Sequence, residues 1–259
     1  MQLGIMNDPR LDACAEARWA AAHGFEFLDL TIEGPCAALE QIDVTELQTI
    51  LTDAGMGVVG HTAWYLPFAS PLARLRQAAV ECVADTFDLF ARLGACTVNV
   101  HIPAGRQMVH LFRRDNNVRW VAECFAQLAE RAAPYNLQIM AEHPPDPGIG
   151  ISDIASILAI DKRLGLHLDV GHANVGGDKL EGLLDRFGSR LVHVHLSDNR
   201  GKSDDHMPLG AGRVDWPRAI RLLKQHGYDG TITLEVFSQD RDYLLLSAQK
   251  VRAWWRDAA

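Results

Sequence analysis

Cysteine and long apolar runs are both scarce in this chain of 259 residues. The five cysteines are odd in number and widely spaced, and no Cys-x-x-Cys pair occurs. This argues against a disulfide scaffold, a zinc knuckle and a dithiol redox motif. No apolar run approaches the roughly 18 residues of a membrane span, and the first residues lack the basic and apolar stretches of an export signal. We therefore expect a reduced, cytoplasmic protein with no membrane partner.

Positive charge is also in deficit. Lys and Arg number 25 against 33 Asp and Glu, which gives a formal net charge of −8. Such a balance repels nucleic acid and anionic membranes at long range, so nucleic acid is not an expected partner. With 48% hydrophobic and 22% charged residues, the composition is ordinary for a globular enzyme and excludes the disordered and collagen-like classes.

Short apolar or β-branched runs alternate with stretches of helical period along the whole chain, without a Ser/Pro-rich linker between them. The alternation predicts parallel strands joined by helices, which close into a single-domain (β/α)8 TIM barrel over residues 1–259. The predicted strands are Gln2–Met6, Phe25–Leu30, Gly57–His61, Thr97–His101, Gln138–Glu142, Gly165–Asp169, Leu191–Leu196 and Thr231–Val236.

Helical periodicity is clearest over Leu72–Leu93 and Val118–Ala133. Asp215, followed by Pro217, is typical of a helix start. The last predicted helix, Tyr243–Trp255, has much apolar surface for an exposed helix, so we expect it to pack on the barrel exterior. A homo-oligomer interface is the alternative. Glycines that precede strands, where helix ends favour positive φ, are Gly24, Gly55, Gly94 and Gly227.

Polar side chains stand at or near the ends of six successive predicted strands, where a TIM barrel builds its active site. Three histidines and three carboxylates around one axis are expensive to bury unless a cation lies among them. Imidazole and carboxylate together suit Zn, Mn, Fe or Co better than Ca. The predicted metal ligands are His61, His101, Glu142, Asp169, His195 and Glu235.

Three further polar residues, His172, Asp204 and His206, follow in the adjoining loops and raise the possible ligands to nine, enough for one to three ions. Taken singly, each histidine is more typical of a packed or surface residue, and only the shared position at one barrel end favours a metal site. His193, two residues before His195, is interpreted as a packing neighbour. No role is predicted for His23, His110, His143, His167 and His226.

Several motifs resemble those of a known family. They are Leu166–His172 (LHLDVGH), His195–Asn199 (HLSDN), His206–Trp216 (HMPLGAGRVDW) and Leu234–Val236 (LEV). With His61–Leu66 (HTAWYL), they resemble the xylose isomerase-like TIM-barrel superfamily, which includes sugar phosphate isomerases and epimerases and endonuclease IV. The resemblance extends over nearly the whole chain.

This resemblance implies that Glu142, Asp169, His195 and Glu235 bind one divalent ion, as the matching residues do in the isomerases and epimerases. The two glutamates would also flank the substrate and carry the proton, which makes them the expected catalytic residues. His172 matches a histidine that contacts substrate oxygens in epimerases and binds metal in endonuclease IV. The further ligands of the endonuclease's trinuclear zinc site are matched by His61, His101, Asp204 and His206.

The favoured function is therefore a metal-dependent isomerase or epimerase of a sugar, a sugar phosphate or a hydroxy-keto acid. A metal that chelates adjacent hydroxyl and carbonyl oxygens acidifies the intervening C–H and stabilises an enediolate. Either Glu142 or Glu235 would remove the proton, and the other would return one to the neighbouring carbon or the opposite face. Arg200 would orient the carbonyl, unless it is a solvated loop charge. Trp64 would form an apolar wall under the sugar ring, unless it packs within its loop.

Two other enzyme classes stay open. A zinc-dependent phosphodiesterase acting on abasic DNA, like endonuclease IV, would use all nine ligands. Against it, residues 31–36 contain an acid and no arginine or glutamine to probe a duplex, and Val170 and Gly171 stand where the endonuclease has Thr-Cys. A lyase similar to dehydroshikimate dehydratase would share the metal ligands and the first proton abstraction.

Two basic or glycine-rich features admit two interpretations each. The cluster of Arg113, Arg114 and Arg119 is either a DNA-facing patch or a solvated helix face, and such runs are more often the latter. Residues 210–212, Gly-Ala-Gly, with Arg213 would suit either a phosphate site or a simple turn.

Overall fold

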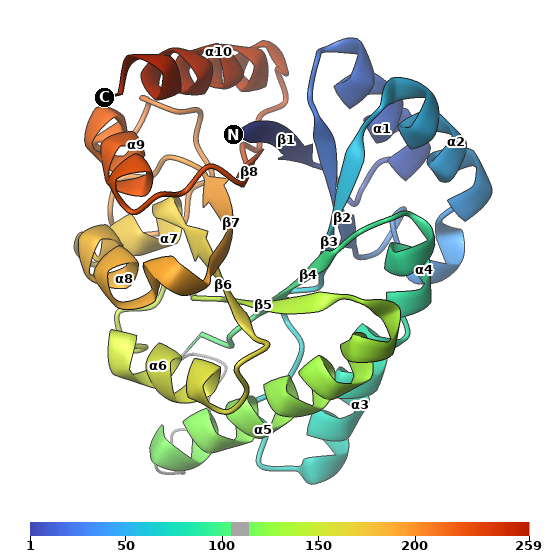
Figure 1. Ribbon diagram of the computed structural model, residues 1–259, viewed down its shortest axis with the longest axis vertical. Coiled ribbons are helices and arrows are strands. Elements are labelled where there is room, and N and C mark those ends of the chain that lie inside the picture. The colour runs from blue at the N-terminus through green and yellow to red at the C-terminus, as the bar shows by residue number, and fades with distance from the viewer. Residues whose placement is uncertain (105–113, 259) are drawn as a thin grey trace.

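In the computed structural model, which describes residues 1–104 and 114–258, eight parallel strands form a closed barrel in chain order. The last strand returns to pair with the first, and helices surround the strands (Figure 1). The predicted TIM barrel is therefore confirmed. The strands are β1 (Gln2–Met6), β2 (Phe27–Ile32), β3 (Gly57–Thr62), β4 (Thr97–His101), β5 (Gln138–Glu142), β6 (Gly165–Asp169), β7 (Leu191–Leu196) and β8 (Thr231–Leu234).

The α-helices run between these strands on the outside of the barrel (Figure 1). Asp215 caps α9 as predicted, since its side chain accepts a hydrogen bond from the backbone N–H of Arg218. The helices are α1 (Ala13–Ala22), α2 (Val44–Ala54), α3 (Ala73–Ala84), α4 (Phe87–Arg92), α5 (Arg114–Ala132), α6 (Ile151–Ala159), α7 (Val170–Asn174), α8 (Leu180–Phe187), α9 (Trp216–Gln225) and α10 (Asp242–Asp257). The four glycines before strands have positive φ, as expected: Gly24, Gly55, Gly94 and Gly227.

The predicted helix Leu72–Leu93 is wrong as one element, because the structure has two helices, α3 and α4, there. At the junction the Thr86 hydroxyl donates to the carbonyl of Val83. The second helix lays the buried ring of Phe90 on Gly60 of β3, so closely that a Cβ at Gly60 would lie 2.9 Å from the ring. The break thus serves a contact between helix and strand that no local periodicity reports.

Three strands have bounds that differ from the prediction: β2 lies two residues later at both ends, β3 extends one residue further, to Thr62, and β8 is shorter. Strand β2 begins at Phe27, because the N–H of Phe25 still donates to Ala20 in the turn that ends α1. Strand β8 ends at Leu234 rather than at Val236. Glu235 nevertheless keeps its place at the barrel end, since its N–H donates to the carbonyl of Leu196 at 3.1 Å.

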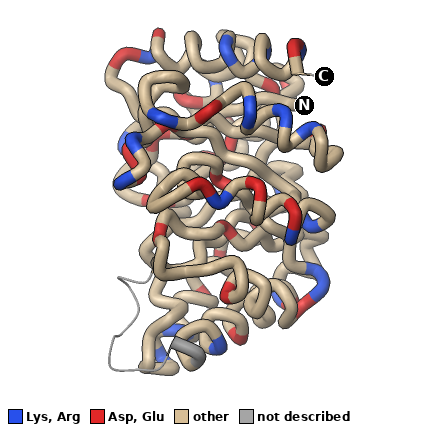
Figure 2. The backbone as a smooth tube through the Cα atoms, turned by 90° about the vertical axis from the view of Figure 1, so that its left-hand side faces the viewer, with Lys and Arg blue, Asp and Glu red and all other residues tan. Residues whose placement is uncertain are grey.

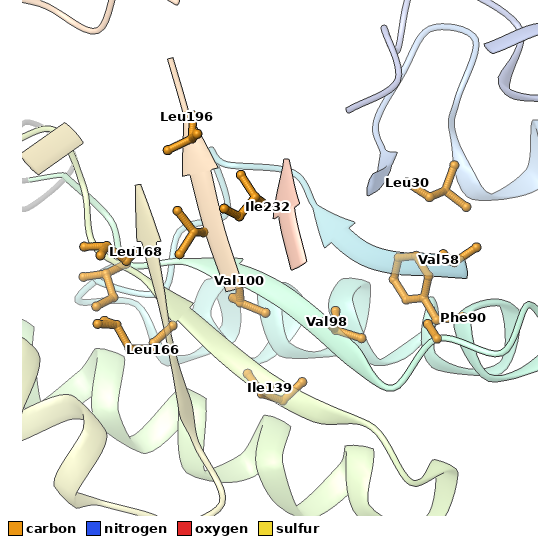
Figure 3. Close-up of a cluster of buried hydrophobic side chains, with 14 of the residues drawn as sticks. Leu30, Val58, Phe90, Val98, Val100, Ile139, Leu166, Leu168, Leu196 and Ile232 are labelled. Atoms are coloured by element: carbon orange, nitrogen blue, oxygen red, sulfur yellow. The ribbon is translucent and has the colours of Figure 1, made fainter. Parts of the chain in front are cut away.

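Residues along each strand alternate between the outside and the inside of the barrel. In β6, Leu166 and Leu168 face the helices, whereas His167 and Asp169 face the interior. The outward set forms the apolar core beneath the helices (Figure 3). The labelled residues of this core are Phe90 of α4 and the strand residues Leu30, Val58, Val98, Val100, Ile139, Leu166, Leu168, Leu196 and Ile232. A separate inner cluster of Phe27, Val59 and Met140, with Val192, fills the part of the barrel nearer the starts of the strands. The polar inward residues therefore gather at the ends of the strands.

The C-terminal helix packs on the barrel, as the first of its two predicted placements required. Trp254 of α10 stacks on Trp216 of α9, with ring centroids 6.1 Å apart and planes at 8°. Both chain ends lie on this side of the molecule, and positions of basic and acidic residues are interspersed along the backbone in Figure 2. Within the described residues, no helix combines the length and apolar character needed for a membrane span.

Candidate metal centre

Four residues from four strand ends meet inside the barrel. Glu142 ends β5, Asp169 ends β6, His195 lies in β7 and Glu235 follows β8. One ligand atom from each lies within 4.8 Å of the others, and all four side chains are buried. The structure therefore brings together the four residues predicted to hold one ion, and we refer to them as the central group.

Unpartnered polar atoms test whether this group fits a cation. Glu142 Oε1 and Asp169 Oδ2 are buried, and neither has a hydrogen-bond partner among the described residues. His195 Nδ1 lies 3.0 Å from Glu235 Oε2 and 4.0 Å from Asp169 Oδ2. Buried carboxylate oxygens without partners are costly unless a cation balances them. Three carboxylates and one imidazole fit Zn, Mn, Co or Fe, so the residues present suit a divalent ion.

A second group, His61, His101 and Glu142, shares a glutamate with the central group. His61 Nε2 and His101 Nε2 lie 2.8 Å apart, and His101 Nδ1 lies 3.2 Å from Glu142 Oε2. Only one proton can stand between two ring nitrogens at this distance. The facing nitrogens are therefore ready to bind either a proton or a metal ion.

The third group is formed by His172, Asp204 and His206. Both histidines place Nε2 3.0 Å from Asp204 Oδ2. His172 Nε2 also lies 3.8 Å from Asp169 Oδ2, and His206 Nδ1 lies 3.7 Å from Glu235 Oε2. His206 has a φ of 45°, a left-handed conformation that is uncommon for a residue with a side chain. All nine predicted ligands thus converge at one end of the barrel.

Crowding shifts the protonation of these groups in opposite directions. Burial raises the pKa of Asp169 to about 7, and the neighbouring carboxylates add to the shift. Burial opposes the charge of Glu235, but His206 and His195 outweigh it and lower its pKa to about 2. Burial likewise opposes the charge of His206, but Glu235 and Asp204 raise its pKa to about 9. Protons therefore balance these carboxylates when no ion does.

A cavity of about 610 Å³ opens onto the three groups. This size is typical of a site for a small molecule. Its polar end is lined by His61, His101, His172, Asp204, His206 and Glu235. Its apolar walls include Met6, Trp64, Ile102, Pro144, Pro145 and Phe237, and charged side chains at Asp8, Arg10 and Glu33 complete it.

Two of the three predicted substrate-binding residues line the cavity, and the third does not. His172 and Trp64 line the cavity, and the Trp64 side chain is 57% exposed, so a ligand can reach it. Arg200 is exposed and is absent from the described cavity lining, and its N–H donates to Asp205 Oδ2 in its own loop. The role of Arg200 in orienting a carbonyl therefore stays a prediction, without support from the cavity lining.

The two basic or glycine-rich features noted in the sequence form a turn and an exposed helix face. Gly210 N–H donates to Asp198 Oδ2 and Arg213 N–H donates to Asn199, so these amides serve a turn rather than a phosphate. Arg119 pairs with Glu123 one turn along α5. His110 and Arg113 lie outside the described residues, as does the side chain of Arg114.

Sequence reasoning missed several residues that contact the ligands. Asp29 is fully buried in β2 and hydrogen bonds to His61 and His195. Asn99 of β4 donates to Glu142, and the His143 carbonyl accepts from His172 Nδ1 at 2.8 Å. Asp29 and Asn99 occupy inward positions between outward apolar residues, so the period of two could have found them.

The family model described as "Xylose isomerase-like TIM barrel" matches residues 17–258. The chain belongs to this family. The resemblance inferred from its motifs is therefore confirmed.

Known relatives and a solved structure match this chain over most of their length. The chain is 30% identical over 227 residues to the uncharacterized protein MJ1311 of Methanocaldococcus jannaschii, covering 83% of this chain and 76% of that protein. It is 23% identical over 257 residues to the putative L-ribulose-5-phosphate 3-epimerase SgbU of Haemophilus influenzae, covering 91% and 87%. A crystal structure of a D-tagatose 3-epimerase-like protein superposes with a TM-score of 0.86 at 24% identity, covering 99% and 97%.

Proposed function

We propose that this protein is a divalent-metal-dependent sugar epimerase or isomerase. One observation carries the proposal: Glu142 and Glu235, from separated positions in the barrel, join a buried four-residue ligand group at a small-molecule cavity. Two carboxylates beside one metal-ligand set are what proton transfer at a carbon next to a carbonyl requires. The sugar epimerase assigned to the relative SgbU supports a sugar or sugar phosphate as the substrate class.

The central group of Glu142, Asp169, His195 and Glu235 would hold the ion, with Zn, Mn, Co or Fe as candidates. The ion would supply Lewis acidity that makes the C–H beside the substrate carbonyl more acidic. His61, His101, His172, Asp204 and His206 would hold one or two further ions, or would bind substrate oxygens instead.

Proton transfer is assigned to the two glutamates. Glu235 is ionised at neutral pH, since its pKa is about 2, and it borders the cavity. One glutamate removes the proton, and the other returns a proton to the opposite face in an epimerase or to the adjacent carbon in an isomerase. Trp64 and Phe237 offer an apolar surface to the C–H face of a sugar ring, while His172 hydrogen bonds to its hydroxyls.

The test is the substitution Glu235→Gln in zinc- or manganese-loaded protein. Deuterium uptake from D2O into ketoses and ketose phosphates, followed by NMR, measures the proton transfer directly. We expect a loss of roughly 10²–10⁴-fold, the usual contribution of a positioned acid or base. Metal content is measured on the same sample, and the exposed Glu123→Gln serves as control. Undiminished exchange in Glu235→Gln at full metal occupancy would exclude Glu235 as a proton carrier.

A second candidate function is zinc-dependent cleavage of abasic DNA, which the presence of three ligand groups favours. Acidic side chains at the cavity and the net charge of −8 oppose it, because binding to DNA depends on phosphate contacts. Elemental analysis combined with an incision assay on an abasic duplex decides between them. About three zinc ions per chain with incision would replace the epimerase proposal.

A further inference from the structure

We propose that Asp29 is a positioning residue that holds two metal-binding histidines, His61 and His195, in the orientation and protonation state that metal binding needs. The inference rests on the proposed metal centre. Asp29 forms a buried group with His61 and His195 that could itself hold an ion, but it is not among the residues that line the cavity, and we assign it the role of holding the two histidines. Asp29 lies in the middle of β2, one inward step before Thr31, the residue in register with His61. It therefore sits directly beneath the ligands.

The two carboxylate oxygens of Asp29 face different ligand groups. Oδ2 lies 2.6 Å from His195 Nε2, and Oδ1 lies 3.1 Å from His61 Nδ1. The Thr233 hydroxyl of β8 also donates to Oδ2, at 2.8 Å. One fully buried carboxylate thus joins a histidine of the central group to a histidine of the second group.

These contacts determine which ring nitrogens carry protons. An ionised carboxylate only accepts hydrogen bonds, so the nitrogens that face Asp29 must donate. The opposite nitrogens are then the ones left for a metal. For His195 this is Nδ1, which faces Glu235 Oε2 at 3.0 Å, and for His61 it is Nε2, which faces His101 Nε2 at 2.8 Å. Without an ion, His195 Nδ1 donates to Glu235, so a bound ion would take the place of that proton. Asp29 thereby turns both opposite nitrogens toward the groups that would hold ions.

Asp29 is itself held from the side away from the cavity. His193 Nδ1 lies 2.7 Å from the Thr231 hydroxyl, and its Nε2 lies 3.3 Å from Asp29 Oδ2 and 3.0 Å from the Thr233 hydroxyl. Strands β7 and β8 thereby restrain a carboxylate that comes from β2, which is separated from them in the barrel by β1. The packing leaves Asp29 no alternative partner in solvent.

The test is metal binding by Asp29→Asn, measured with Zn²⁺ and Co²⁺ alone. The amide keeps the volume but must present its NH2 to one histidine, which forces that ring to change its tautomer or to rotate. We expect zinc affinity, measured by competition with a chromogenic chelator, to fall about 10–100-fold. The visible absorption spectrum of bound Co²⁺ should also change, because it reports the ligand geometry, which a loss of stability alone does not alter.

A matched control is Glu16→Gln, which also replaces a buried carboxylate by an amide. Glu16 of α1 accepts from the N–H of Asp8 and pairs with Arg241, away from the ligand groups. It should leave zinc affinity and the cobalt spectrum unchanged. A milder second variant, Thr233→Val, removes one hydrogen bond to Asp29 and should weaken zinc binding roughly two- to tenfold.

The outcomes separate this inference from the proposed function. Wild-type zinc affinity and cobalt spectra in both Asp29→Asn and Thr233→Val overturn the role of Asp29. If Asp29→Asn does not fold, Thr233→Val decides alone. A wild-type protein that binds neither metal overturns both the inference and the metal-dependent function. Weakened metal binding in the variants of a protein that epimerises no sugar supports the role of Asp29 and overturns only the proposed function.

Discussion

At the scale of single residues, the candidate centre is a set of carboxylates and imidazoles that share protons. Asp169 and Glu235 belong to the same ligand group, yet the pKa of one is raised to about 7 and that of the other is lowered to about 2. Burial dominates at Asp169, whereas two histidines stabilise the charge of Glu235. An ion with two positive charges would replace these shared protons.

Zinc uptake by the metal-free protein at pH 7 should release protons. Asp169 and His206, with pKa values raised to about 7 and about 9, hold protons below those values and lose them above. The metal binds only the deprotonated forms, so apparent zinc affinity should rise between about pH 6 and pH 9. Titration calorimetry in buffers of different ionisation enthalpy measures the release, and a binding heat that is the same in every buffer would contradict it.

At the scale of elements, the alternation of inward and outward residues predicts the strands, whereas the bounds of the helices depend on the strand residues against which they pack. The predicted strands were confirmed in type and order, but the start of β2 lay two residues later than the pattern suggested. The predicted helix Leu72–Leu93 became α3 and α4, and the second of these helices places Phe90 against Gly60. Glycine in the middle of β3 is thus required by close packing, next to the ligand His61.

The substitution Gly60→Ala should lower the free energy of unfolding by about 1–3 kcal/mol, the usual cost of overpacking. An added Cβ would meet three atoms of the Phe90 ring at 2.9–3.0 Å. Gly57→Ala in the same strand is the matched control, because its Cβ would meet only Phe27 Cβ, at 3.6 Å. Urea unfolding of both variants measures the difference. Equal stabilities of the two variants would show that the contact with Phe90 is not tight.

At the scale of the whole molecule, the candidate ligands come from the ends of six strands, β3 to β8, from the short helix α7 that follows β6, where His172 was expected in a loop, and from the loop that follows β7. A bound ion would therefore link most of the barrel wall, while the outer helices stay unaffected. Binding to the folded chain alone stabilises it in proportion to the logarithm of the metal concentration relative to Kd.

Removal of metal should accordingly lower Tm by several degrees. At zinc concentrations of about 1,000 Kd the expected stabilisation is about 4 kcal/mol over protein stripped with a chelator. Calcium at the same concentration is the control, since a centre containing imidazole ligands discriminates against it. Differential scanning calorimetry of the protein with zinc, with calcium and with chelator measures the Tm values without an activity assay. A Tm that is identical with zinc and with chelator would argue against a metal centre.

The sequence by itself determined the barrel, the order of its strands and the placement of the candidate ligands at strand ends. Those features follow from local periodicity, and a polar residue at the end of a parallel strand is placed by topology alone. Only the tertiary structure decided which inward residues of different strands lie at the same height along the barrel axis and contact one another. Asp29 and His195, 166 residues apart, hydrogen bond because closure of the sheet sets the stagger between β2 and β7. Arg200 is absent from the cavity lining, and strand and helix patterns do not encode the position of such a loop residue.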